Sequence, residues 1–340
     1  MKKSNINWII SILLGVVFLY AWLKIVDWKA FISYFQKFDL KIALLFSFFY
    51  IFAYFLRSFR WKIILNPIKK ISIRYSFFIF MSGMLINYLI PVRAGEVAKS
   101  IILKKKDQIR ISESLPTIFI DKITDLFPII LILFLIPLIS VRLNLALYII
   151  VFVLFLIFLF FIGFLFFAVN HRIRAITFLN TILKISPKKY RQSLEDFFTN
   201  FVDGMAIMQN RPKDNCSIYL LTILAVLSES LYIFIVFRAF GSMISYPKIL
   251  FGYTLMNLTY ILPTPPAQIG SNQFMWILIF SFALGENENL TSAAIAFSHL
   301  LTSILIFMIG AISMLSLKIK FSELTKKEVV TKNDRFEREK

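Results

Sequence analysis

Several apolar runs in this chain are long enough to cross a bilayer as helices. One extends from Leu143 to Val169, and a helix needs about 20 mostly apolar residues to span the hydrocarbon core. A transmembrane β-barrel would alternate apolar and polar residues over about 10 positions, whereas these runs are continuous. A soluble chain with 59% hydrophobic residues and a mean hydropathy of +0.76 would aggregate. The sequence therefore predicts an all-α polytopic membrane protein.

The apolar runs predict full transmembrane spans at about 7–26, 40–57, 115–139, 143–169, 217–240 and 290–316. No small-residue cleavage site follows the first run, so we expect it to be a retained helix. We expect one transmembrane domain over 1–317, with halves at about 40–140 and 217–316 and a cytosolic loop at 170–216. A charged cytosolic tail is expected at 318–340.

Two shorter apolar segments break at a proline and resemble each other: Tyr88 and Pro91 in the first correspond to Tyr260 and Pro263 in the second. Proline ends a helix, and a following glycine permits a sharp turn. Irregular backbone at membrane depth survives only where protein buries it or where it lines a wet cavity. A matched pair in two halves of a chain indicates a transporter's binding site. Two kinked packing helices are the alternative.

The broken segments predict two re-entrant hairpins at 75–103 and 249–284. Three predicted spans separate them, and an odd number inverts the second hairpin relative to the first. The sequence thus predicts an inverted repeat in addition to about six full spans.

The net charge of +19 raises the question of a nucleic-acid partner. The cations flank the apolar runs, however, so the positive-inside rule and anionic lipid head groups account for them, and no nucleic acid is expected. The loop 171–213 holds eight Lys or Arg residues and the tail 318–340 holds another eight, while the turn 286–288 holds none. We therefore expect a multi-pass cell-membrane protein with both termini in the cytoplasm. Four lysines would lie outside against this rule: Lys24, Lys29, Lys37 and Lys41.

Ionisable residues inside spans cost about 2.5–3.5 kcal/mol each and normally face protein or water. Asp121, Lys122 and Asp125 fall within one turn of the third span, and Lys122 and Asp125 are spaced to pair. A structural ion-pair network and a polar transport path are both open. Glu229 and His299 are single polar residues, each as consistent with a buried structural role as with a functional one.

Arg57, Arg60 and Trp61 end the second predicted span. An interfacial anchor explains them as well as a function does.

The first proline break is followed by Arg93, Glu96 and Lys99. A half-helix that begins near Ala94 would direct its N-terminal amides toward an anion, and the guanidinium of Arg93 suits phosphate. The alternative is a salt bridge between Arg93 and Glu96 that fixes the turn.

No catalytic, metal or cofactor site is expected. The chain has one cysteine, Cys216, and its two histidines, His171 and His299, lie far apart in sequence. It lacks a DxD motif and a Gly-rich phosphate loop.

Five motifs, in order, resemble the lysylphosphatidylglycerol synthase transmembrane region, also called the flippase-like domain family. They are Arg57 to Trp61, Asn87 to Glu96 with Lys99, Asp121 to Asp125, Pro263 to Gly270, and His299. The chain departs from the family pattern where Val92, Ala267 and Gln268 replace glycines and where Gln273 replaces a glutamate.

This resemblance implies lipid flipping without the soluble aminoacyl-transferase domain of the bifunctional synthases. The leading expectation is a translocator of a polar, phosphate-bearing lipid head group, with anionic or polyprenyl-phosphate lipids as its partners. Gly95 and Gly270 would let backbone approach the ligand. The alternatives are a non-transporting membrane partner in a lipid-modification or lipid-linked glycan pathway, and a lipid-substrate glycosyltransferase. A homo-oligomer or a pathway partner stays open. The candidate substrate-binding residues are Asn87, Pro91, Arg93, Gly95, Glu96, Lys99, Asp121, Lys122, Asp125, Pro263, Pro265, Gly270, Gln273 and His299.

Overall fold

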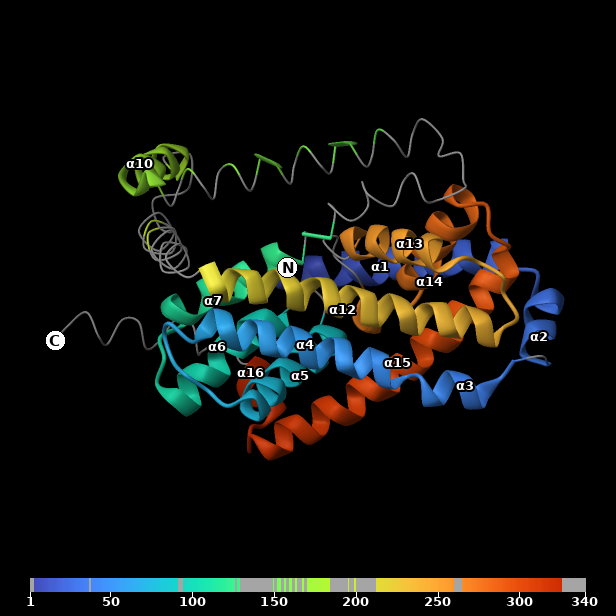
Figure 1. Cartoon of the computed structure of the whole chain (residues 1–340), viewed down its shortest axis with the longest axis horizontal. Coiled ribbons are helices and arrows are strands. Elements are labelled where there is room, and N and C mark those ends of the chain that lie inside the picture. The colour runs from blue at the N-terminus through green and yellow to red at the C-terminus, as the bar shows by residue number, and fades with distance from the viewer. Residues whose placement is uncertain are drawn as a thin grey trace.

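Every regular element in the described part of the chain is helical (Figure 1). The computed structural model describes residues 3–36, 38–90, 94–125, 127–128, 171–183, 212–259 and 265–325, with Glu195, Thr199 and scattered positions from 149 to 170. The predicted all-α membrane fold is confirmed: within the described residues, three helices are long and apolar enough to cross a membrane, at Leu40–Leu65, Lys213–Ala239 and Glu288–Ser316.

The predicted spans agree with the observed helices at three places. Helix α1 (Lys3–Ile25) corresponds to the first span, α12 (Pro212–Ala239) to the fifth and α15 (Glu288–Ser316) to the last. For the third span, the described residues include α7 (Ile111–Thr124), and the remainder, with most of the span 143–169, lies outside the described residues.

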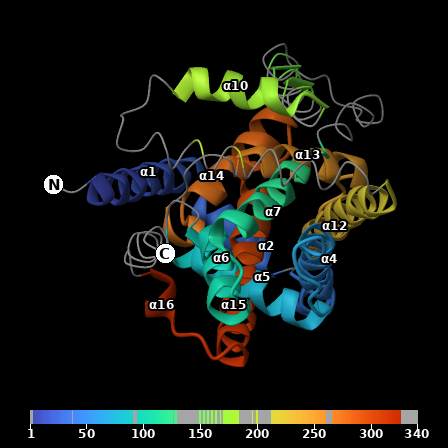
Figure 2. The same cartoon turned by 90° about the vertical axis from the view of Figure 1, so that its left-hand side faces the viewer.

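The second span was predicted too short at 40–57. It consists of α3 (Leu40–Leu45) and α4 (Phe48–Leu65), joined by a turn at Phe46 and Ser47. The helix continues past Arg57 because other helices provide partners for its charged side chains, as described below. Helices α4 and α12 lie side by side (Figures 1 and 2), and Ser228 of α12 donates a hydrogen bond to the carbonyl of Phe49.

The first broken segment forms a helical hairpin of α5 (Ile73–Leu89) and α6 (Ala94–Asp107). At its base, the hydroxyl of Tyr75 donates to Asp107 Oδ2 over 2.7 Å. At its tip, the backbone amide of Gly95 donates to Asn87 Oδ1 over 2.8 Å. The end of α6 therefore lies beside the start of α5, and the two helices run in opposite directions. With 17 and 14 residues, the two helices measure about 25 and 21 Å, shorter than a hydrocarbon core of about 30 Å.

The second broken segment forms a hairpin of α13 (Tyr246–Thr259), a 3-10 turn η2 (Pro266–Gln268), α14 (Ser271–Ile277) and a π-helical turn η3 (Leu278–Ala283). Its base is closed by an ion pair between Lys248 and Glu286. Higher up, a Cβ atom on Gly252 would lie 2.4 Å from the ring of Phe280, so the two arms pack tightly.

The two hairpins start from opposite ends of α15. Ser72 and Lys106, at the base of the first, line one cavity together with Lys318, just past the C-terminal end of α15. Glu286, at the base of the second, lies just before the N-terminal end of α15. The structure thus shows the predicted inversion of the hairpins.

Further helices complete the described structure. Helix α2 (Trp28–Gln36) packs on α15, and α1 packs on α14. Helices α10 (Arg172–Leu183) and α16 (Phe321–Thr325) are short.

The cation asymmetry predicts which end of α15 is outside. In intact cells, a membrane-impermeant maleimide should label Asn287→Cys, because residue 287 is exposed at the N-terminal end of α15. It should miss Lys189→Cys and the native Cys216, which is exposed near the start of α12 and is the internal control. Labelling of Cys216 but not of position 287 would contradict this orientation.

Candidate functional site

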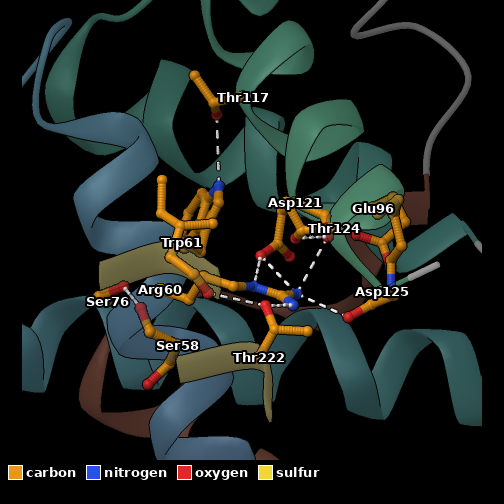
Figure 3. Close-up of polar contacts among 12 residues, drawn as sticks. Ser58, Arg60, Trp61, Ser76, Glu96, Thr117, Asp121, Thr124, Asp125 and Thr222 are labelled. Carbon is orange, nitrogen blue, oxygen red and sulfur yellow. Dashed lines mark hydrogen bonds and ion pairs between the residues drawn. The ribbon is translucent and has the colours of Figure 1, made fainter. Parts of the chain in front are cut away.

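Arg60 of α4 is the centre of a buried polar network (Figure 3). Its side chain is 1% exposed. Nε donates to Asp121 Oδ1 over 2.8 Å, and Nη1 donates to Thr222 Oγ1 over 3.0 Å. Nη2 donates to the Asp121 carbonyl over 3.0 Å and to Asp125 Oδ1 over 2.7 Å. The guanidinium therefore joins α4 to α7 and α12 and compensates two carboxylates.

The network continues from α7 to the first hairpin. Lys122 Nζ lies 3.1 Å from Glu96 Oε1 and 3.6 Å from Asp125 Oδ2, so the pairing of Lys122 with Asp125 that the sequence predicted is confirmed. Lys99 Nζ lies 2.8 Å from Glu96 Oε2 and 4.0 Å from the centre of the Phe80 ring. Glu96 thus links the two lysines, and the aromatic face adds a cation–π contact to the buried one.

The network is balanced in charge and open on one side. Its cations are Arg60, Lys99 and Lys122, and its anions are Glu96, Asp121 and Asp125. The Asp121 and Lys99 side chains are completely buried, whereas Lys122 and Asp125 are each 32% exposed. Buried charges persist only when they are paired, and here the accessible pair is the only part of the six that a polar ligand can readily reach.

Asn87 attaches the tip of the first hairpin to this network. Its amide nitrogen donates to Glu96 Oε1 over 3.1 Å, while its carbonyl oxygen accepts the amide hydrogen of Gly95. A displacement of the tip would therefore break contacts with the charged residues.

A second, partly buried ion pair lies on the same face of α4. Arg57 pairs with Glu229 of α12 and donates to the hydroxyl of Tyr253 over 3.3 Å. Trp61 is completely buried, and its indole donates to Thr117 Oγ1 over 3.3 Å. The interpretation of Arg57, Arg60 and Trp61 as an interfacial anchor is therefore wrong, because α7, α12 and α13 provide their partners.

His299 of α15 connects the tips of both hairpins. Gln273 Oε1 accepts from the amide of Gly270, so its Nε2 faces His299 Nδ1 at 2.8 Å. These two hydrogen bonds of Gln273 assign Nδ1 of His299 as the acceptor and place the ring hydrogen on Nε2. His299 Nε2 lies 2.9 Å from the Ala267 carbonyl and 2.8 Å from the Tyr88 hydroxyl. The two hairpins thus meet near the middle of α15.

The turn that presents the Ala267 carbonyl has an unusual backbone. Ala267 and Gln268 have φ angles of 51° and 56°, a region that costs a non-glycine residue about 1–2 kcal/mol. Both residues stand where the family that the motifs resemble has glycines. The surrounding contacts, including the bond to His299, therefore hold a strained turn in place.

Gly95 and Gly270 serve packing between protein segments, which corrects the expectation that they admit a ligand. A Cβ atom on Gly95 would lie 1.9 Å from the Gly83 carbonyl oxygen, and one on Gly270 would lie 2.6 Å from that of Gly15. Protein already fills the space beside both.

The predicted residues fall into two groups and a remainder. The charged network contains Asn87, Gly95, Glu96, Lys99, Asp121, Lys122 and Asp125. The His299 cluster contains Gly270, Gln273 and His299, and Pro265 packs near Gly15 of α1. Pro91, Arg93 and Pro263 lie outside the described residues, so the anion contact of Arg93 stays a prediction.

The sequence reasoning did not place Arg60, Thr222 or Tyr88 in the site. Arg57 and Arg60 are spaced by three positions and share a helix face, which was the available signal. Nothing in the sequence pointed to Thr222. Among the described residues, no group of three or more His, Cys, Asp or Glu side chains is placed to hold a metal ion.

The fold and the site define a polytopic helical membrane protein with two opposed hairpins that meet beside buried charges. Residues 8–310 match the family model described as the lysylphosphatidylglycerol synthase TM region. The chain belongs to that family, and the resemblance found in the motifs is confirmed. A search of curated proteins and a search of solved structures each gave no match. Membership indicates a membrane protein of lipid-related function.

Proposed function

We propose that this protein is a lipid translocator that moves a polar, phosphate-bearing head group between leaflets of the cell membrane. The observation that carries the proposal is the meeting of two opposed hairpins at His299, next to a charged network with an accessible edge. A polar head group that crosses the apolar layer needs polar partners at mid-depth. Hairpins that enter from opposite ends provide two separable walls around such a point.

Lys122 is the residue that meets the phosphate first. Its ammonium lies between two carboxylates, those of Glu96 and Asp125, and it is the most exposed cation of the network. A phosphate can replace either carboxylate at Lys122 with little change in geometry. Arg60, whose donors are directed at its protein partners, holds α7 in place instead.

The proposal also includes the partners of the protein and the orientation of its termini. The partners are membrane lipids of anionic or polyprenyl-phosphate type, and the protein makes and breaks no covalent bonds in them. Both termini lie in the cytoplasm, because the Lys and Arg residues concentrate there.

A second candidate is a membrane partner that supports a lipid pathway without transport. The balanced charges of the network favour it, since three cations and three anions that satisfy each other form a stable structural lock.

Reconstitution in proteoliposomes distinguishes the two. We expect the protein to accelerate the translocation of a fluorescent phosphatidylglycerol, which is measured as the loss of fluorescence to an impermeant quencher. The translocation rate of a fluorescent glucosylceramide should not change, because that lipid lacks phosphate. Rates equal to those of empty liposomes for both lipids would reject transport in favour of the second candidate.

A further inference from the structure

A cationic cavity lies at the base of the first hairpin, away from the network and from His299. It has a volume of about 370 Å³, and it is lined by Ser72, Arg74, Tyr75, Phe78, Lys106, Ser316, Leu317 and Lys318. The lining comes from the start of α5, the end of α6 and the end of α15. The proposed translocation path uses none of these residues.

Three cations converge on this cavity without anionic partners. Within the described residues, Arg74, Lys106 and Lys318 form no ion pair and no side-chain hydrogen bond. The acids nearby are already engaged: Asp107 accepts from Tyr75 and pairs with Lys69, and Glu323 pairs with Lys105. Among the residues that the structure describes, the cavity therefore has an excess of positive charge.

The backbone adds to this attraction. Ser72 is the N-cap of α5, and the first turn of α5 contains no acidic residue. The amides of Ile73 and Arg74 have no partner within the helix, and the helix dipole favours negative charge at this end. Arg74 is held over the Phe78 ring, with its Cζ 5.6 Å from the ring centre, which keeps the guanidinium at the cavity.

The shape of the site favours a lipid over a free anion. Phe78 and Leu317 give the cavity apolar walls, and it opens where α15, a helix long enough to span the membrane, ends at Ser316. A head group that occupied this position would keep its acyl chains along the apolar faces of α5 and α15. We infer that Arg74, Lys106 and Lys318 form a binding site for the phosphate of an anionic membrane lipid, separate from the translocation path.

The test uses the full-length protein in detergent with short-chain phosphatidylglycerol as the probe. The variant carries Arg74→Gln, Lys106→Gln and Lys318→Gln. The matched control carries Lys70→Gln, Arg110→Gln and Lys320→Gln. These three residues are exposed and lie within a few positions of the cavity residues in the chain, so the control removes the same total charge as the variant. Gel filtration checks that both proteins are folded. A second variant, Ser316→Asp, keeps all three cations and adds a negative charge to the cavity.

We expect phosphatidylglycerol to raise the melting temperature of the wild-type protein and of the control. The triple variant should lose at least about tenfold in affinity, because it removes all three cations that face the phosphate, and Ser316→Asp should weaken binding in the same direction. Short-chain phosphatidylcholine and inorganic phosphate should have little effect. Equal losses in variant and control would overturn the site in favour of diffuse attraction, and an equal response to inorganic phosphate would overturn the assignment to a lipid.

Discussion

Arg60→Met should remove most of the folded protein from the membrane. The substitution preserves the apolar stem but leaves Asp121, whose side chain is completely buried, without its guanidinium partner. Loss of one member of a buried ion pair costs about 3–5 kcal/mol, which is a large part of the stability of a typical domain. The measurement is the yield of monodisperse protein after detergent extraction, together with its melting temperature.

Lys62→Met is the matched control for this prediction. Lys62 lies two residues further along α4 and packs over the Phe59 ring without an ion pair in the described structure, so its loss should change the yield little. Adding Asp121→Leu to Arg60→Met removes the stranded charge and should restore part of the yield. An Arg60→Met protein as abundant and as stable as Lys62→Met would contradict the central position of Arg60.

Gly95→Ala should be nearly as damaging, although it adds only a methyl group. The new Cβ atom would lie 1.9 Å from the carbonyl oxygen of Gly83, a backbone atom that cannot rotate away. Helices α5 and α6 would have to separate, which would break the bond from Gly95 to Asn87. Overpacking typically costs about 1–3 kcal/mol, and we expect the upper end of this range or more.

Gly163→Ala is the control for Gly95→Ala, because no atom from another part of the described structure would lie within 4 Å of a Cβ atom there. Thermal melting of the two purified variants provides the comparison. If both melted at the wild-type temperature, the close packing of the first hairpin would be refuted.

The fold was predictable where the sequence carries strong local signals. The long apolar runs predicted α1, α12 and α15, because length and hydropathy alone indicate a spanning helix. Pro91 and Pro263, with Gly95 and Gly270 after them, predicted two hairpins, because proline and glycine act on their own backbone. The sequence left Arg57 and Arg60 open between an interfacial anchor and a function, because their position inside the protein depends on residues that are distant in the sequence.

The sequence predicted which residues belong to the candidate site better than it predicted their contacts with one another. The family-like motifs around Glu96 and Asp121 selected most of the charged network, and the spacing of Lys122 and Asp125 predicted their pairing. The pairing of Arg57 with Glu229 and the contacts of Arg60 join residues separated by up to 172 positions. Such contacts arise from packing of α4 on α12 and α7, which no local pattern encodes. The roles of Gly95 and Gly270 were misjudged for the same reason.

The transport path is tested most directly by a double variant, Lys122→Met with Asp125→Leu, in the proteoliposome assay. It removes one cation and one anion, so the pair of Arg60 with Asp121 and the pair of Lys99 with Glu96 remain balanced. The matched control, Lys105→Met with Glu323→Leu, removes an ion pair beside the first hairpin's base. We predict that both variants are abundant and that only the control translocates phosphatidylglycerol at the wild-type rate. Wild-type translocation by the Lys122 and Asp125 variant would contradict the path, and its failure to accumulate would show that these two residues serve the structure instead.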